Sequence, residues 1–404
     1  MFSIASYLVA LLVVSLCFSL PAWKFIDEAT SQRASRVNTI DGIRGYLALS
    51  VMLHHAVIAR TWLATGNWTL PADPFFAQLG SVAVSLFFMI TGYLFWGKLV
   101  ARQGHIDWAA LYIGRVFRIG PVYWIAVTGM VATVFWRTGF ELREPIGSLV
   151  NSVVHWYGFG FLIGHDFNGY RNVWIILAGV VWTLKYEWRF YLALFPASFL
   201  ARRRLHLPAA FVLLGIAFAR TIAVKSDSSE YWILFAVGAV CASLREAGIK
   251  PIPRDSVAST ISAAVLIGLF IVHPAPYSVG QALALAIVFV LICNGATFFG
   301  LLTSNAATRL GHASYGIYLL QGFVFSIGFD NSVIKPLVTT NIAAFWAVTL
   351  AGMLALCTTS ALIYAGFESP MIERGRRLGK RASQAIAESL GKRGEVRGEA
   401  HEKV

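Results

Sequence analysis

The sequence predicts an all-α protein that crosses a membrane many times. Of its 404 residues, 57% are hydrophobic and only 13% are charged, a balance far from that of a soluble domain. Apolar runs that are long enough to span a bilayer recur along the chain, and each needs about 20 residues. We therefore expect a polytopic transmembrane helical protein with about ten core membrane helices and one extra N-terminal helix.

Eleven apolar runs mark the expected spans in order. They lie at 3–23, 42–60, 79–99, 119–137, 173–199, 208–224, 229–247, 257–273, 279–301, 311–329 and 342–366. A further run at 147–163 contains Asn151, His155 and several glycines. Polar residues and glycines favour an interfacial or re-entrant segment over a lipid-facing span.

The basic residues set the expected topology. The formal net charge is +13, but the cations lie between apolar runs and not on one soluble domain, so we expect no nucleic-acid partner. If the end of the first run is inside, the basic clusters all become cytoplasmic and the opposite loops are poor in Lys and Arg. These clusters are Lys24/Arg33/Arg36, Lys98/Arg102/Arg115/Arg118, Arg202/Arg203/Arg204, Arg245/Lys250/Arg254, Arg309 and the tail from Arg374.

The chain divides into four expected segments. Residues 1–23 form an N-terminal transmembrane helix; a cleaved signal peptide is the alternative, but no basic residue precedes this apolar run. A cytoplasmic linker occupies 24–41, and one membrane domain occupies 42–370. The basic cytoplasmic tail, 371–404, is expected to be disordered or loosely bound to anionic lipid.

The four cysteines lie inside apolar runs and show no CxxC spacing. This pattern predicts neither a disulfide framework nor a metal site.

Arg44 and His55 share one face of the second expected span. They are eleven residues apart, so on a helix they lie within about 20° of each other and about 16 Å apart along the axis. Imidazole can accept a proton from a hydroxyl, and guanidinium binds phosphate or carboxylate. The pair fits a base near mid-membrane and an anion clamp at the cytoplasmic mouth; a histidine bonded within the bundle and an arginine at the membrane edge are the alternatives.

The fifth expected span carries Lys185, Glu187 and Arg189, each about a dozen residues from either end. Lys185 and Arg189 share a helix face, and Glu187 points nearly the opposite way. We expect Glu187 to face a polar cavity, where it orients or neutralises a histidine, or else to form a salt bridge between helices.

Arg115 and Arg118 lie three residues apart, which places both guanidinium groups on one helix face. Such a pair could hold the phosphates of a nucleotide-bearing donor, or it could anchor the span.

Several motifs occur in a fixed order between Thr39 and Glu373. They are Arg44-x10-His55, the segment LGSVAVSLFFMITGYLF, Arg115-x-x-Arg118, WTLKYEWRFY, SYGIYL and FESP. In this order they resemble the acyltransferase-3 family of integral-membrane O-acyltransferases, which O-acetylate lipopolysaccharide, peptidoglycan and other bacterial glycans. Some family members carry a fused esterase-like domain, and this chain resembles the stand-alone form.

The resemblance implies roles for single positions. It selects His55 over His54 and implies that His55, Glu187 and Arg44 are the catalytic residues. It also implies that Arg44, Arg115 and Arg118 bind the donor. Glu187 occupies the acidic position of WTLKYEWRFY, in which Thr183 replaces the family serine. The other motif positions are Trp182, Tyr191, Ser314, Tyr315, Tyr318, Glu368 and Pro370. The chain departs from the family pattern at Ser85, usually acidic, and at Gln321, often histidine, so no family role is carried over to these two.

The resemblance also implies an activity, that of an acyltransferase which transfers groups other than amino-acyl groups. An acyl group, expected to be acetyl, passes from cytoplasmic acetyl-CoA to a hydroxyl of an extracytoplasmic glycan or lipid-linked saccharide, such as O-antigen or another cell-surface polysaccharide. His55 acts as general base or forms an acyl-histidine, and Glu187 orients it. No permanently bound cofactor is expected, and the location is the bacterial inner membrane.

Sugar contacts are expected from the outward loops 61–78 and 138–172, because their aromatic and amide side chains suit sugar rings and hydroxyls.

Two other functional classes remain open at this point. A transporter of a small acylated or proton-coupled solute would also use buried His, Glu and Arg, although no internal repeat or broken-helix pair supports it. A non-catalytic scaffold or sensor would not need the aligned Arg44 and His55.

Overall fold

The computed structural model describes residues 4–29, 38–162, 164–202, 204–224, 229–249 and 254–401. Within these ranges the protein is helical without any strand, and one isolated bridge joins Phe167 and Tyr170. Six described helices are long and apolar enough to cross a membrane, or up to eight if each of two bent pairs is one span. The polytopic helical class is thus confirmed, whereas the count of about ten core helices is not.

The helices follow the predicted apolar runs closely. Those that correspond to predicted spans are α1 (Ile4–Ser19), α3 (Asn38–Thr65), α4 (Pro74–Ala101), α5 (Trp108–Arg137), α7 (Trp182–Ala197), α8 (His206–Ala223), α9 (Glu230–Glu246), α10 (Asp255–Val272), α11 (Val279–Cys293), α12 (Asn305–Phe323) and α14 (Ile342–Ile363). The remaining α-helices are α2 (Lys24–Glu28), α6 (Ile146–Tyr157), α13 (Ile334–Thr340) and α15 (Ser369–His401). Helices α7, α9 and α11 have 16, 17 and 15 residues, fewer than the roughly 20 of a straight crossing. Their short length explains part of the difference between the predicted number of spans and the number of helices long enough to cross a membrane.

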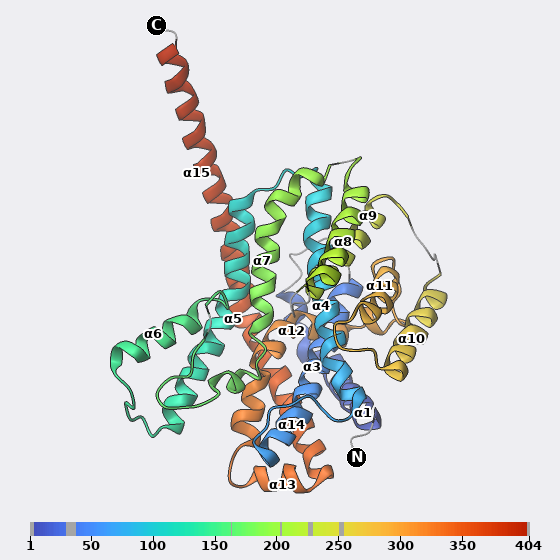
Figure 1. Ribbon diagram of the computed structural model, residues 1–404, viewed down its shortest axis with the longest axis vertical. Coiled ribbons are helices and arrows are strands. Elements are labelled where there is room, and N and C mark those ends of the chain that lie inside the picture. Colours follow the sequence, from blue (N-terminus) through green and yellow to red (C-terminus); the bar gives the residue numbers. More distant parts are fainter. Residues whose placement is uncertain are drawn as a thin grey trace.

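Helix α3 lies at the centre of the bundle. It packs against α4 and α12; α12 also contacts α14 and α1, α4 runs along α9, and α10 pairs with α11 (Figure 1). The α3–α12 contact is close, because a Cβ atom at Gly311 would overlap the carbonyl oxygen of Asp41. Small residues allow such backbone approach between membrane helices.

The two ends of the described chain lie at opposite ends of the molecule (Figure 1). Helix α15 projects from one end, and α13 lies at the other. This arrangement agrees with the expected topology, in which the N-terminus is outside and the tail is cytoplasmic.

The N-terminal helix is packed into the bundle. Phe18 of α1 is fully buried, and Arg309 of α12, only 2% exposed, donates to the carbonyl oxygens of Phe18 and Leu20 at 2.8 and 2.9 Å. Arg309 also pairs with Asp27 at 2.7 Å. A cation at the carboxyl end of a helix satisfies free carbonyls and complements the dipole, so α1 and α2 are held as structural parts of the domain.

The expected linker 24–41 is partly helical. Residues 24–28 form α2 and 38–41 form the first turn of α3, while 30–37, with Arg33 and Arg36, lie outside the described residues. Arg203 and Lys250 of the basic clusters, and 402–404 of the tail, also lie outside them.

The fifth predicted span is shorter than expected. Helix α7 begins at Trp182, and Val173–Leu177 instead forms a 3-10 helix. Ala178 and Gly179 interrupt the helical path with φ angles of 51° and 70°, values that an α-helix excludes. The prediction that the three charged residues of this segment lie a dozen residues from either end was therefore wrong, since they occupy the first turns of α7.

The tail also differs from the expectation. Its first part continues α15, which packs along α5, where a Cβ atom at Gly375 would overlap the ring of Phe117 (Figure 1). Small residues on one face of α15 allow this docking. The prediction of a loose or disordered tail was therefore wrong for this part of the segment.

Within the run at 147–163, residues up to Tyr157 belong to α6, a helix of 12 residues beside α5, and position 163 lies outside the described residues. Twelve residues cannot cross a bilayer. The exposed side chains of Ile146, Val150 and Val154 form an apolar row along it, as the interfacial interpretation predicts.

Candidate active site

Three adjoining cavities lie along the inward face of α3. The basic cavity holds about 370 Å³, the middle cavity about 80 Å³ and the outer cavity about 360 Å³. Arg44 lines both the basic and the middle cavity, while Val84 and Tyr318 line both the middle and the outer cavity. His55 lines the outer cavity, so the predicted Arg44 and His55 face of α3 borders the whole series.

The basic cavity gathers cations from four helices. Its lining includes one acidic residue, Asp41, beside Arg44, Lys98, Arg115, Arg118 and Arg376. The two residues from α3 are 3.8 Å apart, between Arg44 Nη1 and Asp41 Oδ1, and the guanidinium of Arg115 lies 4.8 Å from the centre of the Phe95 ring. An excess of fixed positive charge in a cleft is the electrostatic signature of an anion site.

Arg118 differs from the other cations of this cavity. It forms an ion pair with Glu368, a fully buried carboxylate of the FESP motif, and lies over the Tyr315 ring at 5.7 Å. The buried Glu368 balances its charge, and the other cations of the lining are Arg44, Lys98, Arg115 and Arg376. Of these, Arg44 lies 3.8 Å from Asp41 and Arg376 pairs with Glu373 at 3.0 Å. Arg118 is thus placed to hold α5 against the segment that joins α14 to α15, a role different from the donor clamp that the sequence predicted.

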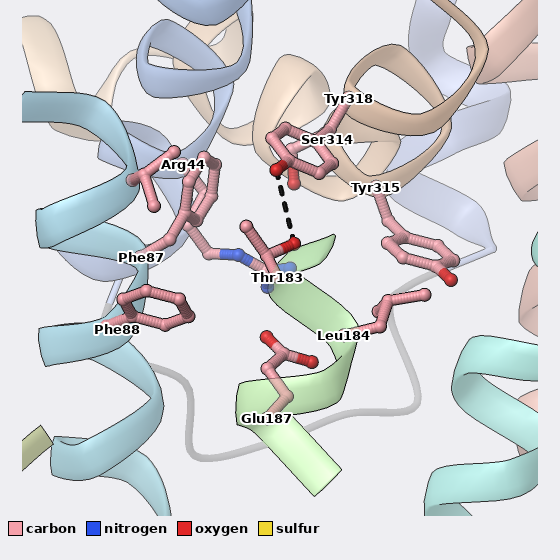
Figure 2. Close-up of a pocket in the computed structure, with 10 residues that line it drawn as sticks. Arg44, Phe87, Phe88, Thr183, Leu184, Glu187, Ser314, Tyr315 and Tyr318 are labelled. Atoms are coloured by element: carbon pink, nitrogen blue, oxygen red, sulfur yellow. Dashed lines mark hydrogen bonds between the residues drawn. The ribbon is translucent and has the colours of Figure 1, made fainter. Parts of the chain in front are cut away.

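The middle cavity brings together motif residues from α3, α7 and α12. Figure 2 shows that Glu187 and Arg44 extend their charged groups into the same space. The hydroxyls of Thr183 and Tyr318 are 3.2 Å apart, and Tyr191 donates to Glu187 Oε2 at 3.4 Å. Glu187 is also within electrostatic range of Arg115. The expectation that Glu187 faces a polar cavity agrees with this placement.

Gln321, and not Glu187, holds the ring of His55. Nδ1 of His55 lies 3.2 Å from Oε1 of Gln321, and Nε2 of Gln321 donates to the Tyr318 carbonyl at 2.6 Å. Because the amide NH₂ group is used by a carbonyl, the amide oxygen faces His55 and must accept from Nδ1–H. In this tautomer Nε2 of His55 keeps its lone pair and can accept a proton. The predicted orienting role of Glu187 does not match this geometry, since Glu187 lines the neighbouring cavity.

His54 has a different environment. Its Nδ1 lies 2.7 Å from the Phe76 carbonyl oxygen, and its ring fills the space where a Cβ atom at Gly80 would lie. A buried ring that is bonded to the backbone of a neighbouring helix is a packing feature. The two histidines thus have different hydrogen-bond partners, although both border the outer cavity.

The outer cavity has aromatic walls. Trp68 is stacked on His55, with ring centres 6.1 Å apart at 29°, and Trp174, Trp182, Tyr277 and Tyr318 also line the cavity. Of the two outward loops predicted to contact sugar, 61–78 reaches this cavity through Trp68, Thr69 and Leu70. The loop 138–172 lines a further cavity with Tyr123 and Lys185, which shares Trp174, Gly179 and Trp182 with the outer cavity.

The remaining motif positions support α12. Ser314 Oγ donates to the Gly311 carbonyl at 2.7 Å, and the Tyr315 hydroxyl donates to the Ile119 carbonyl at 3.0 Å. The six motifs, widely separated in sequence, therefore meet around one series of cavities.

Comparison with known proteins identifies the family. Residues 37–364 match the family described as "Acyltransferase domain", the acyltransferase-3 family. The chain belongs to this acyltransferase family. It is an enzyme by this membership, so the transporter and scaffold interpretations are set aside. No solved structure matches it.

Two named proteins are similar in sequence to this acyltransferase. It is 27% identical to the exopolysaccharide production protein ExoZ of Rhizobium meliloti over 323 residues, which cover 74% of this chain and 91% of ExoZ. It is 23% identical over 379 residues to a Bacillus subtilis protein named "Putative peptidoglycan O-acetyltransferase YrhL", covering 84% of this chain and 55% of that protein. The acyltransferase thus spans nearly all of ExoZ but about half the length of YrhL.

Sequence reasoning missed three residues of the acyltransferase site. Lys98 and Arg376 were assigned to topology alone, because cations at a cytoplasmic edge look the same whether or not they line a cavity. Gln321 was assigned no role because it departs from the family pattern. In the part of the chain that the structure describes, no cluster of three metal-ligating side chains occurs, and the four cysteines are unpaired.

Proposed function

We propose that this acyltransferase moves an acetyl group from cytoplasmic acetyl-CoA to a hydroxyl of an extracytoplasmic glycan, such as O-antigen or another cell-surface polysaccharide, in the bacterial inner membrane. The observation that carries the proposal is the series of cavities along α3, with cations at one end and His55 among aromatic rings at the other. The names of both relatives refer to cell-surface glycans, which supports a glycan acceptor.

The basic cavity suits the donor phosphates. Arg44 and Arg115 offer planar donors that bind phosphate oxygens in pairs, and Lys98 adds a point charge. The Arg44 and His55 Cα atoms are about 16 Å apart along α3, a distance of the order of an extended pantetheine arm. A donor held by its phosphates at the basic end would therefore carry its thioester toward His55.

The chemistry follows from the His55 tautomer. Nε2 accepts the proton of the acceptor hydroxyl, and the hydroxyl oxygen attacks the thioester carbonyl. The tetrahedral intermediate collapses to the ester, and the thiolate leaves with the proton that Nε2 returns. Gln321 keeps Nδ1–H bonded while the ring is charged. The Tyr318 hydroxyl lies at the junction of the two cavities and donates to the Val180 carbonyl at 3.3 Å, so it would stabilise the oxyanion by turning its proton away from that carbonyl. Attack of Nε2 on the thioester, which would give an acyl-histidine, remains the second route.

The narrow middle cavity separates donor from acceptor. Its volume of about 80 Å³ is far below the roughly 300 Å³ or more of ordinary ligand pockets. The hydrogen bond between Thr183 and Tyr318 lies across this constriction. Passage of the pantetheine arm would require this bond to open, which keeps water from the thioester until the donor arrives.

Purified protein and labelled acetyl-CoA test the proposal. With crude envelope glycan as acceptor, wild-type protein should label the glycan and release CoA. His55→Ala should abolish labelling, whereas His54→Ala should retain it if folding is preserved, because Nδ1 of His54 is bonded to the Phe76 carbonyl, although the His54 ring also borders the outer cavity. Full activity of both variants would refute the catalytic assignment. Mass spectrometry of surface polysaccharide from cells with and without the gene would then identify the acceptor by a gain of one acetyl mass.

A further inference from the structure

Two buried glutamines lie in neighbouring membrane helices. Gln78 of α4 is 3% exposed, and Gln281 of α11 is fully buried. Nε2 of Gln281 donates to Gln78 Oε1 at 2.6 Å and to Ser81 Oγ at 2.8 Å. Buried amides in a membrane protein are costly unless all their groups are bonded, so such a network calls for a functional explanation.

This glutamine pair holds the loop that connects α10 to α11. Nε2 of Gln78 donates to the Pro274 carbonyl, and Oε1 of Gln281 accepts from the Tyr277 backbone N–H at 2.9 Å. Both ends of the 274–277 loop are therefore tied to the interior of the bundle. A surface loop with no functional role would not need these hydrogen bonds, since water can satisfy its backbone N–H and C=O groups.

Tyr277 adopts an unfavourable backbone conformation inside the loop. Its φ angle is 59°, in the left-handed region that glycine occupies freely and bulky residues rarely adopt. Strain of this kind persists where the surroundings enforce it, and it clusters at functional sites. A glycine at position 277 would adopt this conformation without strain. The presence of a tyrosine instead indicates that its ring contributes something that glycine could not.

The Tyr277 ring forms part of the wall of the outer cavity. It meets Trp182 at 6.2 Å and 84°, and Tyr231 at 5.1 Å and 84°. Burial raises the pKa of the Tyr277 hydroxyl above its ordinary value, so the phenol stays protonated and can donate at neutral pH.

Tryptophans form other parts of the cavity wall. Trp68 and Trp174 meet edge to face at 5.9 Å, and Trp174 and Trp182 are each more than a third exposed. Large exposed rings that border a concave space are typical of ligand sites. A sugar ring matches such walls, because its C–H face stacks on aromatic rings while its hydroxyls seek hydrogen bonds.

We propose that the outer cavity is a subsite for one sugar ring of the acceptor, and that Tyr277 determines which sugar it accepts. This inference rests on the proposed function. The sugar stacks between the tryptophans and Tyr277, and its reactive hydroxyl points to Nε2 of His55. The cavity volume of about 360 Å³ is at the lower end for ligand sites, which suits one ring better than a long segment of chain.

Two substitutions at position 277 separate the ring from the backbone. Tyr277→Gly removes the ring and keeps the left-handed conformation without strain, and Tyr277→Phe removes only the hydroxyl. Trp136→Ala serves as the control, because Trp136 is 56% exposed on α5 and does not line the cavity. The probes are methyl glycosides of gluco, galacto and manno configuration, with CoA release as the rate signal.

Tyr277→Gly should raise the acceptor KM about tenfold, as expected for the loss of one aromatic contact, and leave the acetyl-CoA KM unchanged. Tyr277→Phe should change the preference among the three sugars more than the overall rate. Trp136→Ala should behave as wild type.

An unchanged acceptor KM in Tyr277→Gly, or an equal rise in the KM of donor and acceptor, would overturn the inference. Quenching of tryptophan fluorescence by the same glycosides, measured without donor, tests the subsite apart from the reaction. If wild-type protein transfers no acetyl group, the proposed function fails; weaker quenching in Tyr277→Gly would still support the sugar site, and equal quenching in both proteins would refute it.

Discussion

The Nδ1 atom of His55 lies 3.2 Å from the amide oxygen of Gln321. The Tyr318 carbonyl fixes the amide by accepting from its NH₂ group, so the arrangement favours one tautomer of His55, the proposed base. A glutamine suits this position because its amide oxygen offers a fixed acceptor for Nδ1–H. Gln321 is thus a positioning residue for His55.

Gln321→Met should lower kcat by about 10- to 100-fold, because a ring without its hydrogen-bond partner spends less time in the reactive tautomer and orientation. The acetyl-CoA KM should stay near the wild-type value. Gln321→Glu keeps an oxygen acceptor for Nδ1 and should retain more activity than Gln321→Met. Steady-state kinetics of the three proteins measure both quantities, and full activity in Gln321→Met would show that the bond has no catalytic role.

Removal of a cation that lines the basic cavity should weaken acetyl-CoA binding, whereas removal of a neighbouring cation outside the cavity should not. Arg376→Ala should raise the acetyl-CoA KM about tenfold, at the low end of the roughly 1.5–3 kcal/mol of a hydrogen bond to a charged group, because Arg376 is partly exposed and also pairs with Glu373. Arg377→Ala is a matched control, because Arg377 is the next residue of α15, its side chain is 73% exposed, and it does not line the cavity. Equal KM values for the two variants would remove Arg376 from the donor site.

Arg118 and Glu368 predict a stability effect. Removal of one partner from a buried ion pair costs about 3–5 kcal/mol, while replacement of both by apolar residues is often neutral. Glu368→Ala should therefore lower the thermal midpoint clearly, and Arg118→Met combined with Glu368→Met should recover much of it. Size-exclusion chromatography after heating, in detergent, measures the midpoint. A single variant as stable as wild type would contradict the structural role.

The contacts of Arg309 predict that the N-terminal helix is retained. Cleavage after residue 23 would remove the carbonyls of Phe18 and Leu20 and leave a buried guanidinium short of partners. The intact mass of protein extracted from membranes should therefore include residues 1–23. A mass that begins after Ala22 or Trp23 would support the signal-peptide alternative.

Much of the fold followed from the sequence because lipid imposes a simple rule. Long apolar runs must become helices, and the 3.6-residue period places Arg44 and His55 on one face without knowledge of any neighbour. The bond between His55 and Gln321 could not be predicted in this way. It joins residues 266 positions apart and depends on the position of α12 along the axis of α3.

The role of Glu187 was harder to predict for a related reason. Its depth depends on where α7 begins, and the left-handed residues Ala178 and Gly179 move that start to Trp182. Apolar content alone does not reveal such a break, because Val173–Leu177 is as hydrophobic as a helix interior. The docking of α15 was missed because its polar composition resembles that of a disordered tail.

The central claim is that the acyl group crosses the protein from the basic cavity to His55. Proteoliposomes in which the protein is inserted in a single orientation test this claim most directly. Labelled acetyl-CoA is supplied only on the side that exposes α15, and acceptor glycan is enclosed on the opposite side. The account predicts labelled glycan in the opposite compartment, with none in His55→Ala vesicles. Label confined to glycan on the donor side would contradict it.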